Sequence, residues 1–118
     1  MFLQKQLEWF ANITLNIPND EWSVAVCSHA NSLGLSHEER MYNYTVMECV
    51  LSAFYRRGVY DGEEKHENPL FNVKISVDYT KKGGTVIAWL GGHDHVDGCA
   101  VKNGIALVET ETDAMYCA

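Results

Sequence analysis

Apolar residues in the first third of the chain follow first a helical and then a strand-like pattern. They recur at helical spacing over residues 2–16, with Leu7 and Phe10 on one face. Residues 22–29 then form a short run whose middle is apolar on both faces, which is typical of a buried strand in a parallel sheet. We therefore expect a helix followed by a buried parallel strand.

A second helix is predicted in the middle of the chain. Ser36-His37-Glu38-Glu39 has the spacing of a capping box, and the helix should end near Arg57, with Gly58 as a left-handed stop. Its core stripe is Tyr44, Met47, Val50, Leu51 and Phe54. The polar residues 59–69 are expected to form a loop.

The last third of the chain has the pattern of several strands. Residues 73–79 alternate between apolar and polar, as in a strand with one wet face, whereas residues 85–90 are apolar on both faces and predict a central strand. Residues 99–108 predict a hairpin around Asn103-Gly104, because this dipeptide suits a type I′ turn. The whole order predicts one domain over residues 1–118, of mixed α/β class, with a mixed sheet and flanking helices.

Charge and composition narrow the classes of function. The 118 residues carry 9 basic and 16 acidic side chains, a formal charge of −7, which removes electrostatic support for nucleic-acid binding. No apolar run reaches the roughly 18 residues of a membrane span, and no signal peptide is evident. Cys27 and Cys49 lie in apolar runs and are expected to be buried thiols. We therefore expect a cytoplasmic protein with no nucleic-acid or membrane partner.

Candidate chemistry lies where the two most apolar strands end. The first strand leads into Ser28-His29, and the later one leads into Gly92-His93-Asp94-His95. Ligand sites gather at the carboxyl ends of strands in open α/β sheets, and imidazole is the commonest protein ligand for transition metals. Asp94 and Asp97 either join such a site or bond to nearby backbone amides. His37 and His66 lie in polar segments and are expected to be surface side chains.

These segments resemble the C-terminal part of the calcineurin-like metallophosphoesterases. That family has a late strand ending in Gly-His or Ser-His and a later one ending in Gly-His-x-His, as Ser28-His29 and Gly92-His93-Asp94-His95 do here. A Gln6-Leu7-Glu8-Trp9 helix precedes the first motif, as in relatives with a Gln-x-x-Trp helix. Residues 83–90 lead into the second motif, and Asn103-Gly104-Ile105 follows it.

The resemblance implies a site for divalent metal ions of the Mn, Zn, Fe or Mg class that hydrolyses phosphate esters. It implies that His29 and His93 ligate one metal and that His95 ligates the other. It assigns no catalytic residue to this chain. The Asp-x-His, Gly-Asp and Gly-Asn-His motifs with which complete members begin are absent from the sequence, and with them the bridging aspartate and the asparagine ligand.

Three hypotheses follow from this partial match. In the first, the chain is half of a metallophosphoesterase-type β-sandwich and has little or no activity alone. In the second, it is a binding module that keeps the fold and has lost the chemistry. The third hypothesis is a protein that holds a single metal through His29, His93 and His95 with Asp94 or Asp97. Half of a sandwich leaves one apolar sheet face uncovered, so we expect a homodimer or a partner chain that supplies the missing N-terminal half.

Overall fold

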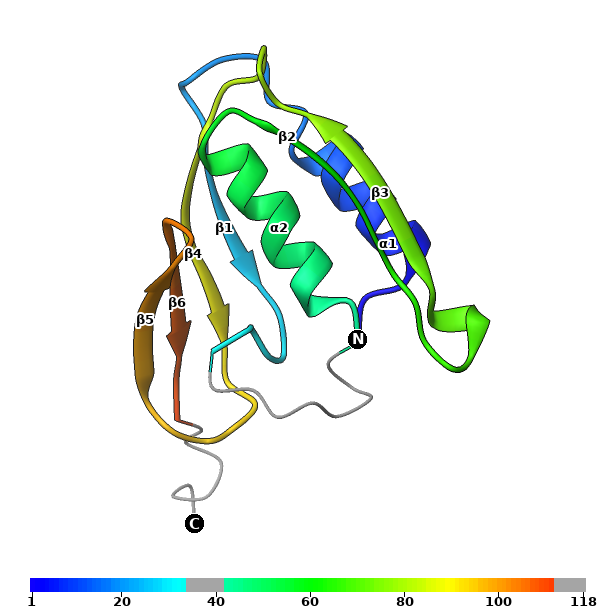
Figure 1. Ribbon diagram of the computed structural model, residues 1–118. Coiled ribbons are helices and arrows are strands. Elements are labelled where there is room, and N and C mark those ends of the chain that lie inside the picture. The colour runs from blue at the N-terminus through cyan, green and yellow to red at the C-terminus, as the bar shows by residue number, and fades with distance from the viewer. Residues whose placement is uncertain (34–41, 112–118) are drawn as a thin grey trace.

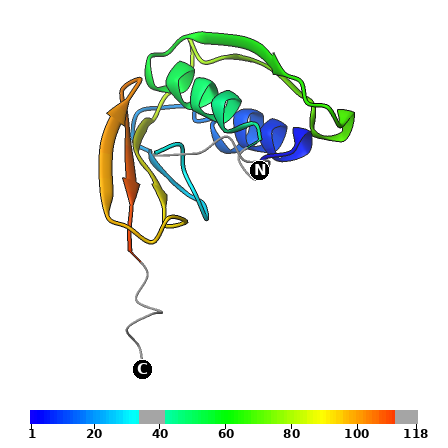
Figure 2. The same cartoon turned by 60° about the horizontal axis from the view of Figure 1, so that its bottom comes forward.

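The computed structural model describes residues 1–33 and 42–111, in which the helices lie between two sheets (Figures 1 and 2). Sheet A contains, in spatial order, β1 (Ser23–Cys27), β4 (Thr85–Gly91), β6 (Ile105–Glu109) and β5 (Gly98–Lys102). Sheet B contains β2 (Val59–Glu64) and β3 (Val73–Asp78). The helical segments are α1 (Gln4–Trp9), which continues as a π-helical turn at Phe10–Thr14, then α2 (Tyr44–Tyr55), and a 3-10 turn at Pro69–Phe71. The predicted mixed α/β class with a mixed sheet is confirmed.

Sheet A brings three strand ends to one edge. The strands β1, β4 and β6 run parallel, and β5 runs antiparallel to β6. The predicted hairpin is confirmed, and Asn103 and Gly104 at its turn have φ angles of 52° and 82°, as a type I′ turn requires. The carboxyl ends of β1, β4 and β6 therefore lie side by side.

The core forms where α2 packs between the two sheets. The predicted stripe of α2 is buried along its whole length, with Val50, Leu51 and Phe54 fully enclosed. Trp89 of β4 and Leu107 of β6 meet it from sheet A, and β3 buries alternate residues from the other side, as its pattern predicts. This packing fixes sheet A relative to the helices.

The ends of α2 differ from the predicted ones. Asn43, with a φ of 71°, precedes the helix, and the predicted capping box lies outside the described residues. At the other end Arg57 has the left-handed φ of 56°, so the prediction for Gly58 is wrong. Asp20 accepts a 2.7 Å hydrogen bond from the Arg57 guanidinium, which also lies over the Phe54 ring and is held in place by both contacts.

Two strand predictions are also wrong. Residues 59–64 form β2 and not a loop. Within the described residues this strand pairs with β3 alone, and an edge strand tolerates charges on both faces. β1 is parallel as expected but lies at the edge of sheet A, and its outer face is open, so that the Cys27 thiol is exposed. Two apolar residues of the same outer face, Ile87 and Val101, are 62% and 75% exposed.

The described helices are all short. None of those within residues 1–33 and 42–111 has both the length and the apolar content needed to cross a membrane. Their role in this fold is to separate the two sheets.

Candidate functional site

His29 and His93 meet at the carboxyl ends of β1 and β4. The Nε2 atom of His29 lies 2.8 Å from the Nδ1 atom of His93, and the two rings approach edge to face with their centroids 4.8 Å apart. A hydrogen bond at this distance requires one nitrogen to donate and the other to accept. The structure thus places two imidazoles, 64 residues apart in the chain, at one point.

Backbone hydrogen bonds continue beyond the strands and hold the two histidine segments together. The Ser28 amide donates to the Leu90 carbonyl over 3.1 Å, and the Gly92 amide donates to the His29 carbonyl over 3.0 Å. The Trp89 indole also donates to the Ser28 hydroxyl over 2.8 Å. Because both backbones are tied to each other, the two imidazoles are positioned by the sheet itself.

Asn31 is a supporting residue that the sequence pattern does not reveal. Its fully buried amide donates to the carbonyls of Trp89 and Val108, over 3.0 and 2.9 Å, and its oxygen accepts from the Leu33 amide over 2.8 Å. One side chain thereby fastens the segment after β1 onto β4 and β6. The sequence alone does not show that a single polar residue next to an apolar strand makes these three hydrogen bonds.

Gly91 allows the two segments to approach closely. A Cβ atom on Gly91 would lie 2.7 Å from the Asn31 nitrogen and 3.0 Å from the carbonyl carbon of Ala30. Real Cβ atoms do not come this close to backbone atoms, so any side chain here would push the His29 segment away. At Gly92 the nearest atom, the Thr110 carbonyl oxygen, is 3.3 Å away and a side chain is less restricted.

The remaining candidates after β4 are not drawn into one cluster. Within residues 1–33 and 42–111, no three His, Cys, Asp or Glu side chains lie close enough together to hold a metal ion. His95 is exposed and has a left-handed φ of 56°. Asp97 accepts a 2.8 Å hydrogen bond from the backbone amide of Glu111. The assignment of His95 as a ligand stays a prediction.

A buried carboxylate, missed by the sequence analysis, ends β6 next to this region. Glu109 is 4% exposed, and its Oε1 atom has no hydrogen-bond partner. Burial and, secondarily, the charge of Asp94 raise the pKa of Glu109 above its ordinary value. Both causes favour the neutral form of the Glu109 carboxyl over its carboxylate.

A pocket of about 240 Å³ opens beside the two imidazoles. It is lined by His29 and His93, and the polar side chains of Gln6, Ser28 and Tyr44 also border it. Burial raises the pKa of Tyr44, so its hydroxyl stays a neutral group at physiological pH. No lysine or arginine is among the described residues of its lining. A metal ion held by the imidazoles would add positive charge for an anion in this pocket.

The imidazole pair would have to rearrange to hold one metal ion. Two nitrogens on a tetrahedral Zn²⁺ with bonds of about 2.05 Å lie roughly 3.3 Å apart. The observed separation of 2.8 Å belongs to a hydrogen bond in which the two nitrogens face each other, so the rings would have to move apart by a few tenths of an ångström and also tilt until both nitrogens point at the ion. Two imidazoles leave further coordination positions for ligands from elsewhere.

The remaining two histidines were predicted to be surface residues. The prediction is wrong for His66, whose side chain is 8% exposed and stacks on Tyr42. Its Nε2 atom lies 2.8 Å from the Asn43 amide oxygen and 3.3 Å from a Glu64 carboxylate oxygen. His37 lies outside the described residues. His66 has polar neighbours in the sequence, and this pattern gave no sign that its ring packs against Tyr42.

The His29–His93 pair is thus supported by the strand backbones, by Asn31 and by a close approach at Gly91. The pair borders a pocket whose described lining residues include no lysine or arginine. No family model, curated protein or solved structure matches this chain.

Proposed function

We propose that this chain is the C-terminal, histidine-bearing part of a metal-dependent phosphoesterase of the calcineurin-like type. The observation that carries the proposal is the 2.8 Å contact between His29 and His93 at the ends of two adjacent parallel strands. The two motifs that resemble this family lie far apart in the sequence, and their imidazoles nevertheless meet.

In this proposal His29 and His93 ligate one divalent ion through Nε2 and Nδ1, and His95 ligates a second. Bound metals of the Mn, Zn, Fe or Mg class supply the positive charge and the activated water for ester hydrolysis. The pocket beside the pair, whose described lining residues include no lysine or arginine, would take a phosphate ester whose charge is met by metal. The neutral Tyr44 hydroxyl at its border can orient a phosphate oxygen.

The ligand set of this chain is incomplete, and the outer face of sheet A agrees with a missing half. Two cations close together require a bridging carboxylate or hydroxide. Parallel sheets are ordinarily covered on both faces, whereas Ile87 and Val101 are largely exposed here. We propose that a second copy, or a chain that carries the other half of the site, covers this face.

The open face also supports a second candidate function. A binding module that has kept the fold and lost the chemistry would need the same apolar face, and it would not need the imidazole pair. Metal affinity therefore separates the two functions, and the metal stoichiometry separates a one-metal protein from half of a two-metal site.

The proposal is tested by calorimetric titration of the chain with Zn²⁺ and Mn²⁺. We expect binding that falls at least tenfold in His29→Ala and in His93→Ala, because each loses one ligand. His95→Ala is expected to lower the stoichiometry or affinity of a second ion only. Lys81→Ala, an exposed residue at the opposite end of β4, is the control and should bind as the unaltered chain does. Unchanged affinity in both His29→Ala and His93→Ala would refute the proposal and leave the binding module.

A further inference from the structure

The turn between β5 and β6 contains the only Asn-Gly pair of the sequence, Asn103-Gly104. Both residues are exposed, and both have left-handed φ angles, of 52° and 82°. The flanking residues Lys102 and Ile105 form the last pair of the ladder, so the Gly104 amide lies in the turn and outside that pair. The backbone nitrogen that follows Asn103 is therefore open to the Asn103 side chain and to solvent.

The structure requires glycine at position 104. Its φ is left-handed, which an L side chain rarely adopts, and a Cβ atom there would collide with the ring of Tyr55 at the end of α2. Any other residue would strain the turn or displace Tyr55. The fold therefore keeps an unhindered backbone nitrogen next to Asn103.

The Asn103 side chain connects this turn to α2. Its Nδ2 atom donates a 2.9 Å hydrogen bond to Oε1 of Glu48, and the Lys102 ammonium lies 3.0 Å from Oε2 of the same carboxylate. Glu48 is buried, and a buried carboxylate depends on such donors. The contact between the hairpin and α2 therefore depends on an amide, rather than an acid, at position 103.

We propose that Asn103 is a site of spontaneous deamidation, and that the reaction turns its contact with Glu48 from attraction into repulsion. The Gly104 amide gives its proton to a solvent base, and its nitrogen attacks Cγ of Asn103. The bond between Cγ and Nδ2 breaks, and Nδ2 leaves as ammonia after it takes a proton from solvent. Water then adds to one carbonyl of the cyclic imide, breaks the bond from that carbonyl to nitrogen and leaves a carboxylate. The reaction consumes one water molecule and involves no oxidation or reduction.

Both products of the reaction remove the donor that Glu48 uses. Opening of the imide at Cγ gives aspartate, which suits a type I′ turn as asparagine does. Its carboxylate would lie beside that of Glu48, and the two negative charges would share the Lys102 ammonium. Opening at the other carbonyl gives isoaspartate, which adds a carbon atom to the main chain and lengthens the turn. Either product weakens the contact between the hairpin and α2.

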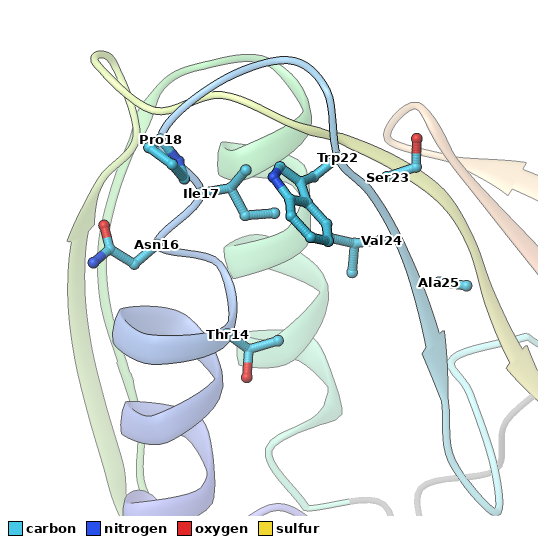
Figure 3. A pocket seen from close by; sticks show the side chains of 8 residues that line it. All are labelled: Thr14, Asn16, Ile17, Pro18, Trp22, Ser23, Val24 and Ala25. Atoms are coloured by element: carbon cyan, nitrogen blue, oxygen red, sulfur yellow. The ribbon is translucent and has the colours of Figure 1, made fainter.

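The same contact slows the reaction while the protein is folded. Nδ2 must leave Glu48 before it can depart as ammonia, so Asn103 reacts more slowly in the chain than in a free peptide. Asn16 provides an internal comparison, because it is also exposed but precedes Ile17. Figure 3 shows these two residues at the edge of a hollow of about 370 Å³. The branched side chain of Ile17 hinders attack by its backbone nitrogen, so Asn16 should keep its amide.

The reaction is tested by peptide mass spectrometry of the folded chain after storage in a mildly basic buffer. A capped peptide of residues 100–107 is the comparison without Glu48. We expect Asn103 to convert in the chain roughly tenfold more slowly than in the peptide, which corresponds to one hydrogen bond to a charged group. An Asn103 that keeps its amide over many half-lives of the peptide, or that converts no faster than Asn16, would overturn the proposal.

The consequence for the fold is tested by urea denaturation of Asn103→Asp, which has the aspartate product. We expect the equilibrium constant for unfolding to rise roughly tenfold. The same substitution should have a smaller effect in a Glu48→Gln background, because one of the two charges is absent there. Asn68→Asp is the control, since the Asn68 side-chain oxygen only accepts a 3.1 Å bond from the Leu70 amide and aspartate can accept it equally.

Asn103→Gly separates the repulsion from the lost hydrogen bond without altering Glu48, and it serves even if Glu48→Gln fails to fold. Gly-Gly suits the same turn, removes the donor and adds no charge. Asn103→Asp should therefore be less stable than Asn103→Gly. Equal stability of these two variants, or an equal effect of Asn103→Asp in both backgrounds, would overturn the proposed repulsion. None of these measurements involves metal, so their outcome is independent of the proposed function.

Discussion

At the scale of single residues, the site depends on glycine and asparagine as much as on histidine. Gly91 lets the segment that carries His29 lie against β4, and Asn31 fastens the same segment by three hydrogen bonds. In the proposed function the imidazoles supply the chemistry, and these two residues hold the segment that places His29 2.8 Å from His93.

Gly91→Ala should disturb the site without removing a ligand. The added methyl would lie 2.7 Å from the Asn31 nitrogen, so the backbone must shift, and we expect a loss of about 1–3 kcal/mol in the free energy of unfolding. Urea denaturation measures this loss. Gly92→Ala is the matched control and should cost less, because its nearest contact is 3.3 Å. Equal stability of the two variants would contradict the close approach at Gly91.

Glu109 predicts a pH effect whose sign is set by its raised pKa. A carboxyl group with a raised pKa in the folded state destabilises the fold once pH rises through that pKa, and it costs nothing below its unfolded pKa. Glu109→Gln removes the charge, so it should be more stable than the unaltered chain at pH 7, by up to about 1 kcal/mol. The gain should vanish below roughly pH 4.

Urea denaturation of metal-free protein at both pH values measures the effect of Glu109→Gln. The Glu64→Gln variant is a useful comparison, since that carboxylate has partners in Asn43 and His66. A Glu109→Gln chain that is less stable at pH 7 would mean that the carboxylate has a partner.

At the scale of elements, the site is built where three parallel strands end. Asn31 connects the segment after β1 to the carbonyls of both β4 and β6. We expect Asn31→Ala to lower the free energy of unfolding by roughly 2–3 kcal/mol, because two buried carbonyls lose their donor. Affinity for Zn²⁺ should fall as well.

The matched control for Asn31→Ala is Asn103→Ala, which removes one 2.9 Å bond to Glu48 far from the histidines. It should affect stability and leave metal affinity unchanged. If Asn31→Ala leaves the metal affinity unchanged, the hydrogen bonds of Asn31 do not position the two histidines.

The elements also show which features the sequence could predict. The apolar pattern of β4 and the Asn103-Gly104 turn predict a central strand and a hairpin, because each depends on local periodicity or turn chemistry. β2 was missed because an edge strand can be polar on both faces. The burial of β1 was overestimated because an apolar run does not reveal whether a strand lies at the centre or the edge of a sheet.

The candidate site was predictable only in part, for a similar reason. His29 and His93 were singled out because each follows an apolar strand, and only the parallel pairing of β1 and β4 brings them together. Asn31 and Glu109 are single polar residues, whose roles depend on contacts between distant segments.

At the scale of the whole molecule, the open outer face of sheet A predicts association. We expect the chain alone to form a homodimer at micromolar concentration, measured by size-exclusion chromatography with light scattering. Ile87→Lys places a charge in the centre of this face and should shift the population towards monomer. Val59→Lys, on the other sheet, should not. A chain that stays monomeric at all concentrations up to high micromolar would contradict the prediction that a second copy covers the outer face of sheet A.

The central claim is that His29 and His93 hold one divalent metal ion between the ends of β1 and β4. The most direct measurement is the anomalous difference map of crystals of the protein grown with Zn²⁺. The account predicts a peak about 2.0–2.1 Å from both the Nε2 atom of His29 and the Nδ1 atom of His93. A map in which these two atoms keep their mutual hydrogen bond and the Zn²⁺ peaks lie elsewhere would contradict it.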